Sequence, residues 1–220
     1  MPTLFNEEVI HHESNLEKDF IYILKFDPGV LMPTLKHLPS LKAQPLKIPY
    51  SLDGKEKFYV PDFYVKYKNG SQVIFEVKYE DYLKKHKKEL TPKFSAARAY
   101  AKKHGLKFET VTDAQIRTGY KTSITFLDQF RTDIVDLKLT QRILDGLAEK
   151  KKCSGNELLS SIAHDEQDYN FLIRPFWVLV FNQRICCDLF ESVTLDSLFW
   201  LSSTRKQKFL SFPYKSKSTK

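Results

Sequence analysis

The chain has 220 residues, enough for one large domain or two small ones, and its 42% of hydrophobic residues excludes a wholly disordered chain. Its 35 basic and 27 acidic residues leave a net charge of +8, which favours a polyanionic partner such as nucleic acid. No apolar run approaches the roughly 20 residues that span a bilayer, and no secretion signal is expected, so no membrane partner is predicted. The three cysteines form neither a disulfide framework nor a four-ligand zinc set, which predicts a reducing cytosol.

The first 117 residues alternate helical and strand patterns and predict one α/β domain. A helix begins after Ser14 and ends at the breaker Asp27-Pro28-Gly29, and a looser proline-rich stretch follows it. Two strands come next, at residues 58–67 and 72–79, on either side of the hairpin signal Lys68-Asn69-Gly70.

A helix and a further strand complete this domain. The lysine-rich residues 81–89 have the pattern of a solvated helix or loop. Thr91-Pro92 supplies a cap and a first-turn proline for a helix that runs to Gly105. Residues 106–112 form a strand, and because a strand, a helix and a strand at this spacing make a crossover, the last strand should lie parallel in the same sheet.

The second half of the chain predicts a smaller, mainly helical domain over residues 118–202. Helical patterns and a capping box come first and short strands follow, at residues 140–151, 154–157, 171–180, 185–190 and 193–201. Three helices followed by short strands predict a winged-helix-like domain that binds a partner or DNA. Residues 203–220 are basic and predict a flexible tail.

The turn of the predicted hairpin decides how its two strands face each other. If Lys68-Asn69-Gly70 is a three-residue loop that ends in a left-handed glycine, Tyr67 pairs with Ser71. Counting back along both strands then places Asp62 directly opposite Glu76. A two-residue Asn-Gly turn would shift the register by one residue and separate the two acids.

In the first register, both carboxylates and the amine of Lys78 lie on one face of the hairpin. The Cβ atoms of Asp62 and Glu76 would be about 5 Å apart, and facing carboxylates repel unless a cation compensates them. Mg²⁺ prefers carboxylates, waters and phosphate oxygens, which suits phosphodiester hydrolysis. The alternative is an exposed strand face with ordinary charges, on which Lys78 pairs with Glu76. The spacing alone favours neither reading.

Glu17 has two alternative roles. Ser14-x-x-Glu17 matches a capping box, in which Glu17 would bond to the first backbone N–H of its helix. Its carboxylate would otherwise reach the sheet as a further metal ligand. The local pattern favours the cap.

Several short motifs follow one another across residues 13–117 in a characteristic order. They are Ser14-x-x-Glu17, Lys25-Phe26-Asp27-Pro28, Gln44-Pro45-Leu46, Val60-Pro61-Asp62-Phe63, Phe75-Glu76-Val77-Lys78 and Lys93-Phe94-x-Ala96-Ala97. This run resembles the TnsA family of transposon endonucleases and is far more specific than a lone P-D…E-x-K. The resemblance implies a restriction-endonuclease-like mixed sheet flanked by helices. It also implies a PD-(D/E)xK enzyme that cuts the 5′ ends of a mobile element.

The resemblance further implies a role for each residue of the motifs. It makes three acidic side chains the metal ligands: Glu17, Asp62 and Glu76. The backbone carbonyl of Val77 becomes an additional ligand, Lys78 becomes the catalytic lysine, and Gln44 stands where related nucleases have a supporting polar residue. Mg²⁺ is the expected cofactor, with Mn²⁺ as a second candidate.

Basic side chains near this site are expected to hold the DNA backbone. They lie in the lysine-rich segment and the helix after it: Lys84, Lys85, Lys87, Lys88, Lys93, Arg98, Lys102 and Lys103. The resemblance implies that the substrate is double-stranded DNA at transposon ends. It also implies two protein partners, the integrase-like transposase TnsB, which acts on the 3′ ends, and the ATPase regulator TnsC.

Two other functions remain open at this point. A stand-alone restriction or junction-resolving nuclease of the same fold would cut without partners. A non-catalytic assembly adaptor would recruit an ATPase or a transposase through its C-terminal domain. The intact acidic residues and lysine of the motifs argue against the adaptor. Genes for an integrase-like transposase and an ATPase immediately downstream would favour the heteromeric transposase.

Overall fold

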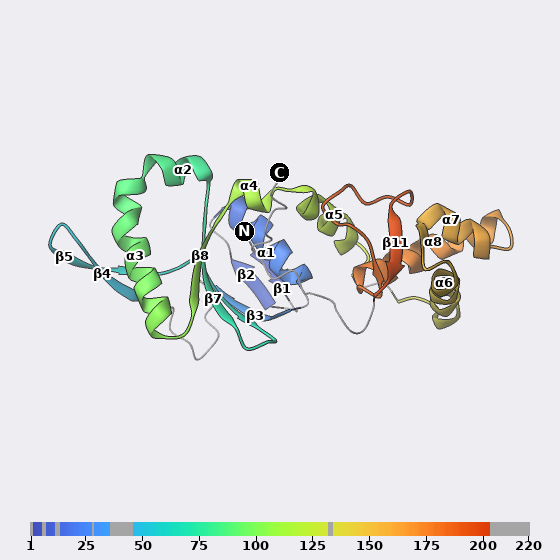
Figure 1. Cartoon of the computed structure of the whole chain (residues 1–220), viewed down its shortest axis with the longest axis horizontal. Helices are drawn as coiled ribbons and strands as arrows, with labels where there is room; N and C mark the ends of the chain where they lie inside the picture. The colour runs from blue at the N-terminus through green and yellow to red at the C-terminus, as the bar shows by residue number, and fades with distance from the viewer. Residues whose placement is uncertain are drawn as a thin grey trace. The chain divides into compact units, whose positions relative to one another are not determined.

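A computed structural model of the chain describes residues 2–5, 8–11, 14–27, 29–35, 46–131 and 134–202. The chain divides between Arg117 and Thr118 into two compact units (Figure 1). Gln44 and the tail predicted at residues 203–220 lie outside the described residues. None of the described helices is long and apolar enough to cross a membrane.

The first unit is built on a four-stranded mixed sheet with the order β3-β6-β7-β8. Its strands are β3 (Val30–Leu35), β6 (Phe63–Tyr67), β7 (Gln72–Lys78) and β8 (Lys107–Thr112). Two separate hairpins accompany it, β1 (Pro2–Phe5) with β2 (Glu8–His11) and β4 (Ile48–Leu52) with β5 (Lys55–Tyr59). The helices are α1 (Asn15–Phe26), α2 (Glu80–Lys85), α3 (Lys87–Lys103) and α4 (Asp113–Ile116). As predicted, β8 runs parallel to β7, whereas the other neighbours are antiparallel.

The β6–β7 hairpin has the register that a three-residue loop predicts. The ladder pairs Phe63 with Phe75, and Gly70 at the turn has a φ of 82°, in the left-handed region. One pair beyond the ladder, Asp62 therefore lies opposite Glu76. The predicted register is therefore confirmed. It could be predicted because the conformation of the turn depends on Gly70 and its neighbours in sequence, not on the rest of the fold.

Gly70 provides a direct test of this turn. A Cβ atom at this position would meet nothing within 4 Å, so the cost of a side chain comes only from the left-handed backbone. We expect Gly70→Ala to lower the free energy of unfolding by about 1 kcal/mol in urea titrations. Gly70→Asn should lower it less, because asparagine tolerates this conformation better. An alanine variant as stable as the wild type would contradict the assigned turn.

Two predictions for the strands are wrong. The strand predicted at residues 58–67 is two strands, because β5 ends at Tyr59 and β6 begins at Phe63. Pro61 between them cannot donate a ladder hydrogen bond, so the chain can leave one hairpin and enter the sheet there. The stretch predicted to be irregular contains β3 and β4, and each of these strands has one proline. A proline is tolerated there because β3 is an edge strand of the sheet and β4 belongs to a two-stranded hairpin.

The start of the long helix also differs from the prediction. Helix α3 begins at Lys87, four residues before Thr91, so Pro92 lies inside the helix. Leu90 is buried at 5% exposure, which favours helical structure before the proline. The Thr91 hydroxyl donates to the carbonyl oxygen of Lys87 at 2.6 Å. The end near Gly105 is as predicted, with a φ of 68°.

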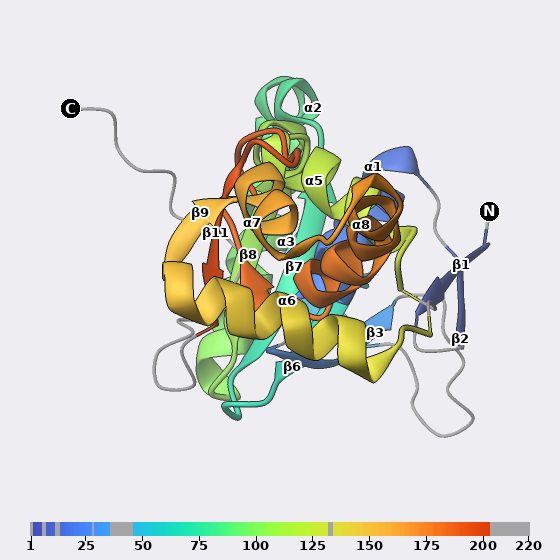
Figure 2. The ribbon, with the colours of Figure 1, turned by 90° about the vertical axis from the view of Figure 1, so that its right-hand side faces the viewer.

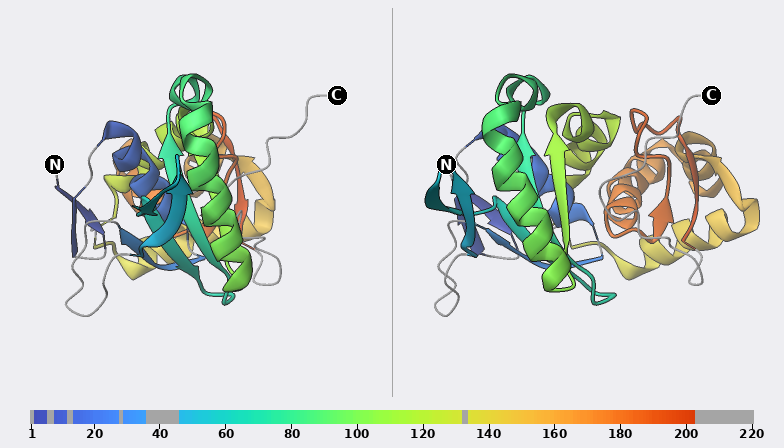
Figure 3. Two further views of the ribbon diagram at one scale, coloured as in Figure 1. Left: turned by 90° about the vertical axis from the view of Figure 1, so that its left-hand side faces the viewer. Right: turned by 60° about the vertical axis from the view of Figure 1, so that its left-hand side comes forward.

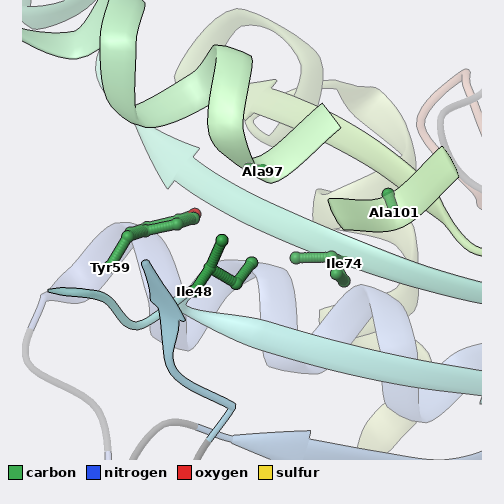
Figure 4. Packing of buried hydrophobic residues seen from close by; sticks show 5 residues of the cluster. All are labelled: Ile48, Tyr59, Ile74, Ala97 and Ala101. Atoms are coloured by element: carbon green, nitrogen blue, oxygen red, sulfur yellow. The ribbon is translucent and has the colours of Figure 1, made fainter. Parts of the chain in front are cut away.

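Helices cover both faces of the sheet in the first unit (Figures 1 and 3). On one face α1 packs through Phe20, whose ring centroid lies 5.0 Å from that of Phe63 and 5.2 Å from that of Phe75. On the other face α3 and the β4–β5 hairpin enclose an apolar cluster (Figure 4). The cluster consists of Ile48, Tyr59, Ile74, Ala97 and Ala101. Both faces of β7 are therefore buried.

The second unit combines helices with a three-stranded antiparallel sheet (Figure 2). Its helices are α5 (Gly119–Asp128), α6 (Leu137–Lys150), α7 (Gly155–Ile162) and α8 (Glu166–Phe181). Its strands are β9 (Lys152–Ser154), β10 (Ile185–Cys186) and β11 (Leu198–Leu201), in the order β10-β11-β9. The predicted cap of α7 is present, since the Ser154 hydroxyl oxygen accepts from the backbone N–H of Glu157 at 3.1 Å. Helix α5 was not predicted, and the winged-helix assignment stays a prediction.

Candidate active site

The two acids and the lysine of the motif come together at the end of the β6–β7 hairpin. Asp62 immediately precedes β6, and Glu76 lies near the end of β7. Their side chains are only 5% and 1% exposed. The Lys78 Nζ atom lies 3.0 Å from Asp62 Oδ2 and 3.0 Å from Glu76 Oε1. One ammonium group thus bridges both carboxylates.

A third oxygen faces the same ammonium group. The carbonyl oxygen of Val77 accepts a hydrogen bond from Lys78 Nζ at 3.1 Å. The oxygens of Asp62, Glu76 and Val77 therefore converge on one point. They are hard donors, the kind that Mg²⁺ takes, and they come from three of the four residues that the motif resemblance assigns to a metal, the fourth being Glu17. The donor set therefore fits a divalent cation.

Burial excludes the alternative of an exposed strand face. The Asp62 carboxylate is tied to the sheet, because its Oδ2 atom accepts from the backbone N–H of Val77 at 2.9 Å. Two carboxylates buried at this level would be costly without compensating charges. Ordinary solvated charges would not be held in this way.

Two further side chains complete the surroundings of Glu76, and the sequence interpretation missed both roles. The Tyr59 hydroxyl donates to Glu76 Oε2 at 2.5 Å. The Lys93 Nζ atom lies 3.3 Å from Glu76 Oε1 and 4.5 Å from the centroid of the Tyr59 ring. Lys93 and Lys78 together balance the two carboxylates. The repulsion that suggested a metal is therefore already offset by two lysines.

The position of Lys93 follows from how α3 lies on β7. Ala97 packs in the same cluster as Ile74, and Lys93 reaches Glu76. Four helical residues rise about 6 Å and two strand residues about 7 Å, so one turn back along α3 matches two residues forward along β7. Small side chains at Ala97 and Ala101 let the helix come close to the sheet. The helical spacing of Leu90, Phe94, Ala97 and Ala101 in the sequence marks the buried face of α3. Lys93 lies beside this face, and that position was the signal that could have identified its role.

Burial and charge shift the proton affinities of this site. Burial is the main cause that raises the pKa of Asp62, and the charge of Glu76 adds to it, while Lys78 opposes both. Burial alone would lower the pKa of Lys78, but the charges of Glu76 and Asp62 outweigh it and the pKa is raised. Burial, and then the neighbouring Glu76, also raise the pKa of Tyr59, so its phenol stays a proton donor.

Glu17 lies in the first turn of α1 and forms part of its cap. The hydroxyl oxygen of Ser14 accepts from the backbone N–H of Glu17 at 3.1 Å, and the hydroxyl donates to Glu17 Oε1 at 3.1 Å. Phe20, one turn later, contacts the residues next to Asp62 and Glu76 in sequence. Among the described residues, no three His, Cys, Asp or Glu side chains gather as a cation site. The structure therefore does not bring Glu17 together with the two sheet carboxylates.

The residues expected to bind DNA lie on α2 and α3. Seven of them are exposed: Lys84, Lys85, Lys87, Lys88, Arg98, Lys102 and Lys103. Lys84 forms an ion pair with Glu80 at 2.8 Å, which leaves it on the surface. Lys93 differs from this group because it is only 24% exposed and contacts Glu76.

Residues 40–113 match the model of a protein family described as the TnsA-like endonuclease N terminal domain. The matched segment contains the two sheet carboxylates and both lysines of the site, but it begins after Glu17. Among curated proteins, none matches the chain significantly. Over these residues the chain is similar to the TnsA-like endonuclease N-terminal domain, which bears out the resemblance for the motifs from Gln44 onward.

Proposed function

We propose, on the premise of the TnsA-like endonuclease domain, that this chain is the metal-dependent DNA endonuclease subunit of a heteromeric transposase. It would cut the 5′ ends of a mobile element by phosphodiester hydrolysis. The observation that carries the proposal is the buried pair of Asp62 and Glu76, whose oxygens converge with the Val77 carbonyl on the ammonium group of Lys78.

The chain's own residues would divide the work in a simple way. Asp62, Glu76 and the carbonyl oxygen of Val77 would hold Mg²⁺, or Mn²⁺ in its place. A bound divalent cation lowers the pKa of a coordinated water and offsets charge on the scissile phosphate. Lys78 would then leave the carboxylates to orient the attacking water and stabilise the developing negative charge. Glu17 would complete the site from α1 after its side chain leaves the Ser14 hydroxyl and turns toward the sheet carboxylates.

The cap and the ligand roles of Glu17 can be separated by two variants. Ser14→Ala removes the capping oxygen, so we expect a loss of about 1 kcal/mol in unfolding free energy and little change in nicking. Glu17→Gln keeps the backbone cap, so stability should hold while nicking falls on the order of 100-fold. Chemical denaturation and a nicking assay measure the two effects. Wild-type nicking by Glu17→Gln would reduce Glu17 to a capping residue.

The exposed basic side chains of α2 and α3 supply a surface for the DNA backbone in this proposal. Lys84, Lys85, Lys87 and Lys88 follow β7 closely in the chain, whereas Arg98, Lys102 and Lys103 lie further along α3, beyond the Lys93 that contacts Glu76. Double-stranded DNA at transposon ends is the proposed substrate. Each phosphate contact adds to the salt dependence of binding, which gives this surface a measurable signature.

The test of the proposed function is a reconstituted cleavage assay. The purified chain is combined with TnsB, TnsC and a duplex that carries a transposon end, with Mg²⁺ or with a chelator. We expect cuts at the 5′ end only when Mg²⁺ and the partners are present, since isolated activity is not expected. Cutting by the chain alone at its own preferred sites would favour a stand-alone nuclease. Assembly without any 5′ cut would favour the adaptor.

A further inference from the structure

Tyr59 reaches the site from outside the sheet. It is the last residue of β5, which among the described strands pairs with β4, and it is 2% exposed. Its ring packs in the cluster between the hairpin, β7 and α3, so the hydroxyl is held in one position (Figure 4). From there it donates to Glu76 Oε2 at 2.5 Å. The phenol thus fixes the rotation of the Glu76 carboxylate.

This hydrogen bond separates the two oxygens of Glu76 by function. Oε2 is engaged by the Tyr59 hydroxyl, whereas Oε1 faces Lys78 at 3.0 Å and Lys93 at 3.3 Å. Oε1 is also the oxygen that converges with Asp62 Oδ2 on Lys78. A carboxylate that rotated freely would offer either oxygen to a cation. With Tyr59 in place, Oε1 is the oxygen that faces the cation site.

Lys93 is held beside Oε1 by a second interaction. Its ammonium group lies 4.5 Å from the centroid of the Tyr59 ring, which attracts a cation through its face. Lys93 would therefore stay beside the Tyr59 ring when Glu76 Oε1 binds a divalent cation. A positive charge held at this place repels any further cation that binds to Oε1.

We propose that Tyr59 and Lys93 are positioning residues that act on Glu76 in opposite senses. Tyr59 aims Oε1 at the cation site and so strengthens divalent-cation binding. Lys93 neutralises Glu76 when no cation is bound and weakens the binding of the cation that replaces it. The inference rests on the proposed nuclease function and adds two residues to its site.

The test measures Mn²⁺ binding to the full-length chain by calorimetry, without DNA and without activity. Tyr59→Phe removes only the hydroxyl, and we expect the Kd to rise by about tenfold or more, as for other groups that orient a metal ligand. Lys93→Met keeps the length of the side chain without its charge, and we expect the Kd to fall roughly three- to tenfold. Lys93→Arg retains the charge and should restore the wild-type Kd.

Matched controls separate these effects from general ones. Tyr64→Phe removes a hydroxyl that bonds to Gln72 instead of Glu76, and Lys107→Met removes an exposed lysine of β8. Both should leave the Kd unchanged. Weaker binding in both Tyr59→Phe and Lys93→Met, or no change in either, would overturn the inference.

A further variant distinguishes failure of this inference from failure of the proposed function. Asp62→Asn removes the negative charge of one of the two converging carboxylates and should abolish tight Mn²⁺ binding. If Asp62→Asn binds Mn²⁺ as the wild type does, the cation site itself is wrong, and the roles of Tyr59 and Lys93 fall with it. If Asp62→Asn loses binding while Tyr59→Phe and Lys93→Met match the wild type, only the present inference is wrong.

Discussion

Asp62→Asn is expected to abolish metal-dependent nicking in the reconstituted assay, by on the order of 1,000-fold or more, while the protein stays folded. The substitution removes the charge of one carboxylate that faces the proposed cation. The asparagine oxygen can still accept from the backbone N–H of Val77, which holds residue 62 at 2.9 Å in the wild type. Circular dichroism should therefore remain that of the wild type. Nicking at the wild-type rate would show that the nuclease site has been assigned to the wrong residues.

The same variant should be more stable than the wild type when no metal is present. The pKa of Asp62 is raised above its ordinary value of 3.8, chiefly by burial and then by Glu76, so the folded state binds this proton more tightly than the unfolded state. An acid with a raised pKa costs stability as pH rises above the ordinary value, and the full cost is present above the raised pKa. Each tenfold change in proton affinity corresponds to about 1.4 kcal/mol. We expect Asp62→Asn to gain on the order of 1–3 kcal/mol near neutral pH.

Urea titrations across pH measure this difference. The gain of Asp62→Asn should shrink as pH falls toward the ordinary pKa, because the wild-type carboxyl becomes protonated in both states. A gain that is constant with pH would mean that the ionisation of Asp62 is not its cause. A loss of stability at neutral pH would mean that Lys78 stabilises ionised Asp62 by more than burial costs it.

Lys78→Met is expected to lower stability, whereas Asp62→Asn raises it, and to lower nicking as Asp62→Asn does. Methionine matches much of the lysine stem but leaves Asp62 and Glu76 buried with one ammonium group fewer. Removing one partner of a buried ion pair typically costs about 3–5 kcal/mol, and since Lys93 still neutralises Glu76 we expect about 3 kcal/mol. Nicking should fall on the order of 100- to 1,000-fold, because the ammonium group proposed to stabilise the developing charge is lost.

A divalent cation should restore much of the stability that Lys78→Met loses. The oxygens that Lys78 bridges would then be available to the cation, and a cation at 100 times its Kd adds about 2.7 kcal/mol to the folded state. Thermal denaturation with and without Mn²⁺ measures the rescue. The stability should return while nicking does not. No stabilisation by Mn²⁺ in either the variant or the wild type would contradict the cation site.

The loss in Lys78→Met should grow as pH rises above the Asp62 pKa of about 6, because Lys78 lowers this pKa and its removal raises it further. The pKa of Lys78 is raised above its ordinary 10.5, so its charge stabilises the folded state fully below that value and is lost only above it. Lys66→Met, at an exposed position of β6, is the matched control and should leave stability nearly unchanged. A comparable loss in this control would point to a general effect of charge.

Local signals predicted the parts of the fold that depend on neighbouring residues in sequence. The turn at Gly70, the cap at Ser14 and the stop at Gly105 each depend on backbone conformation over a few residues, and all three are present. The hairpin of β4 and β5 was missed although its signal is also local. Asp53-Gly54 has φ values of 52° and 71°, which is the two-residue turn typical of a hairpin. The prolines around it had favoured an irregular stretch.

Tertiary contacts overrode local signals elsewhere. Thr91-Pro92 is a sound start signal for a helix, yet α3 begins four residues earlier because its first turns carry the buried Leu90. A proline disfavours an internal helical position but does not forbid it when packing compensates. Local propensity is worth a fraction of a kcal/mol for each residue, and burial of a leucine is worth more.

The sequence by itself limited the hairpin to two registers, and the three-residue loop that Gly70 closes is the one that places Asp62 opposite Glu76. It also determined that Lys78 shares their face. Only the tertiary structure decided that this face is buried, since burial depends on α3 and the β4–β5 hairpin, which come from distant parts of the chain. It alone brought Tyr59 and Lys93 to Glu76, because contacts between separate elements have no fixed spacing in sequence.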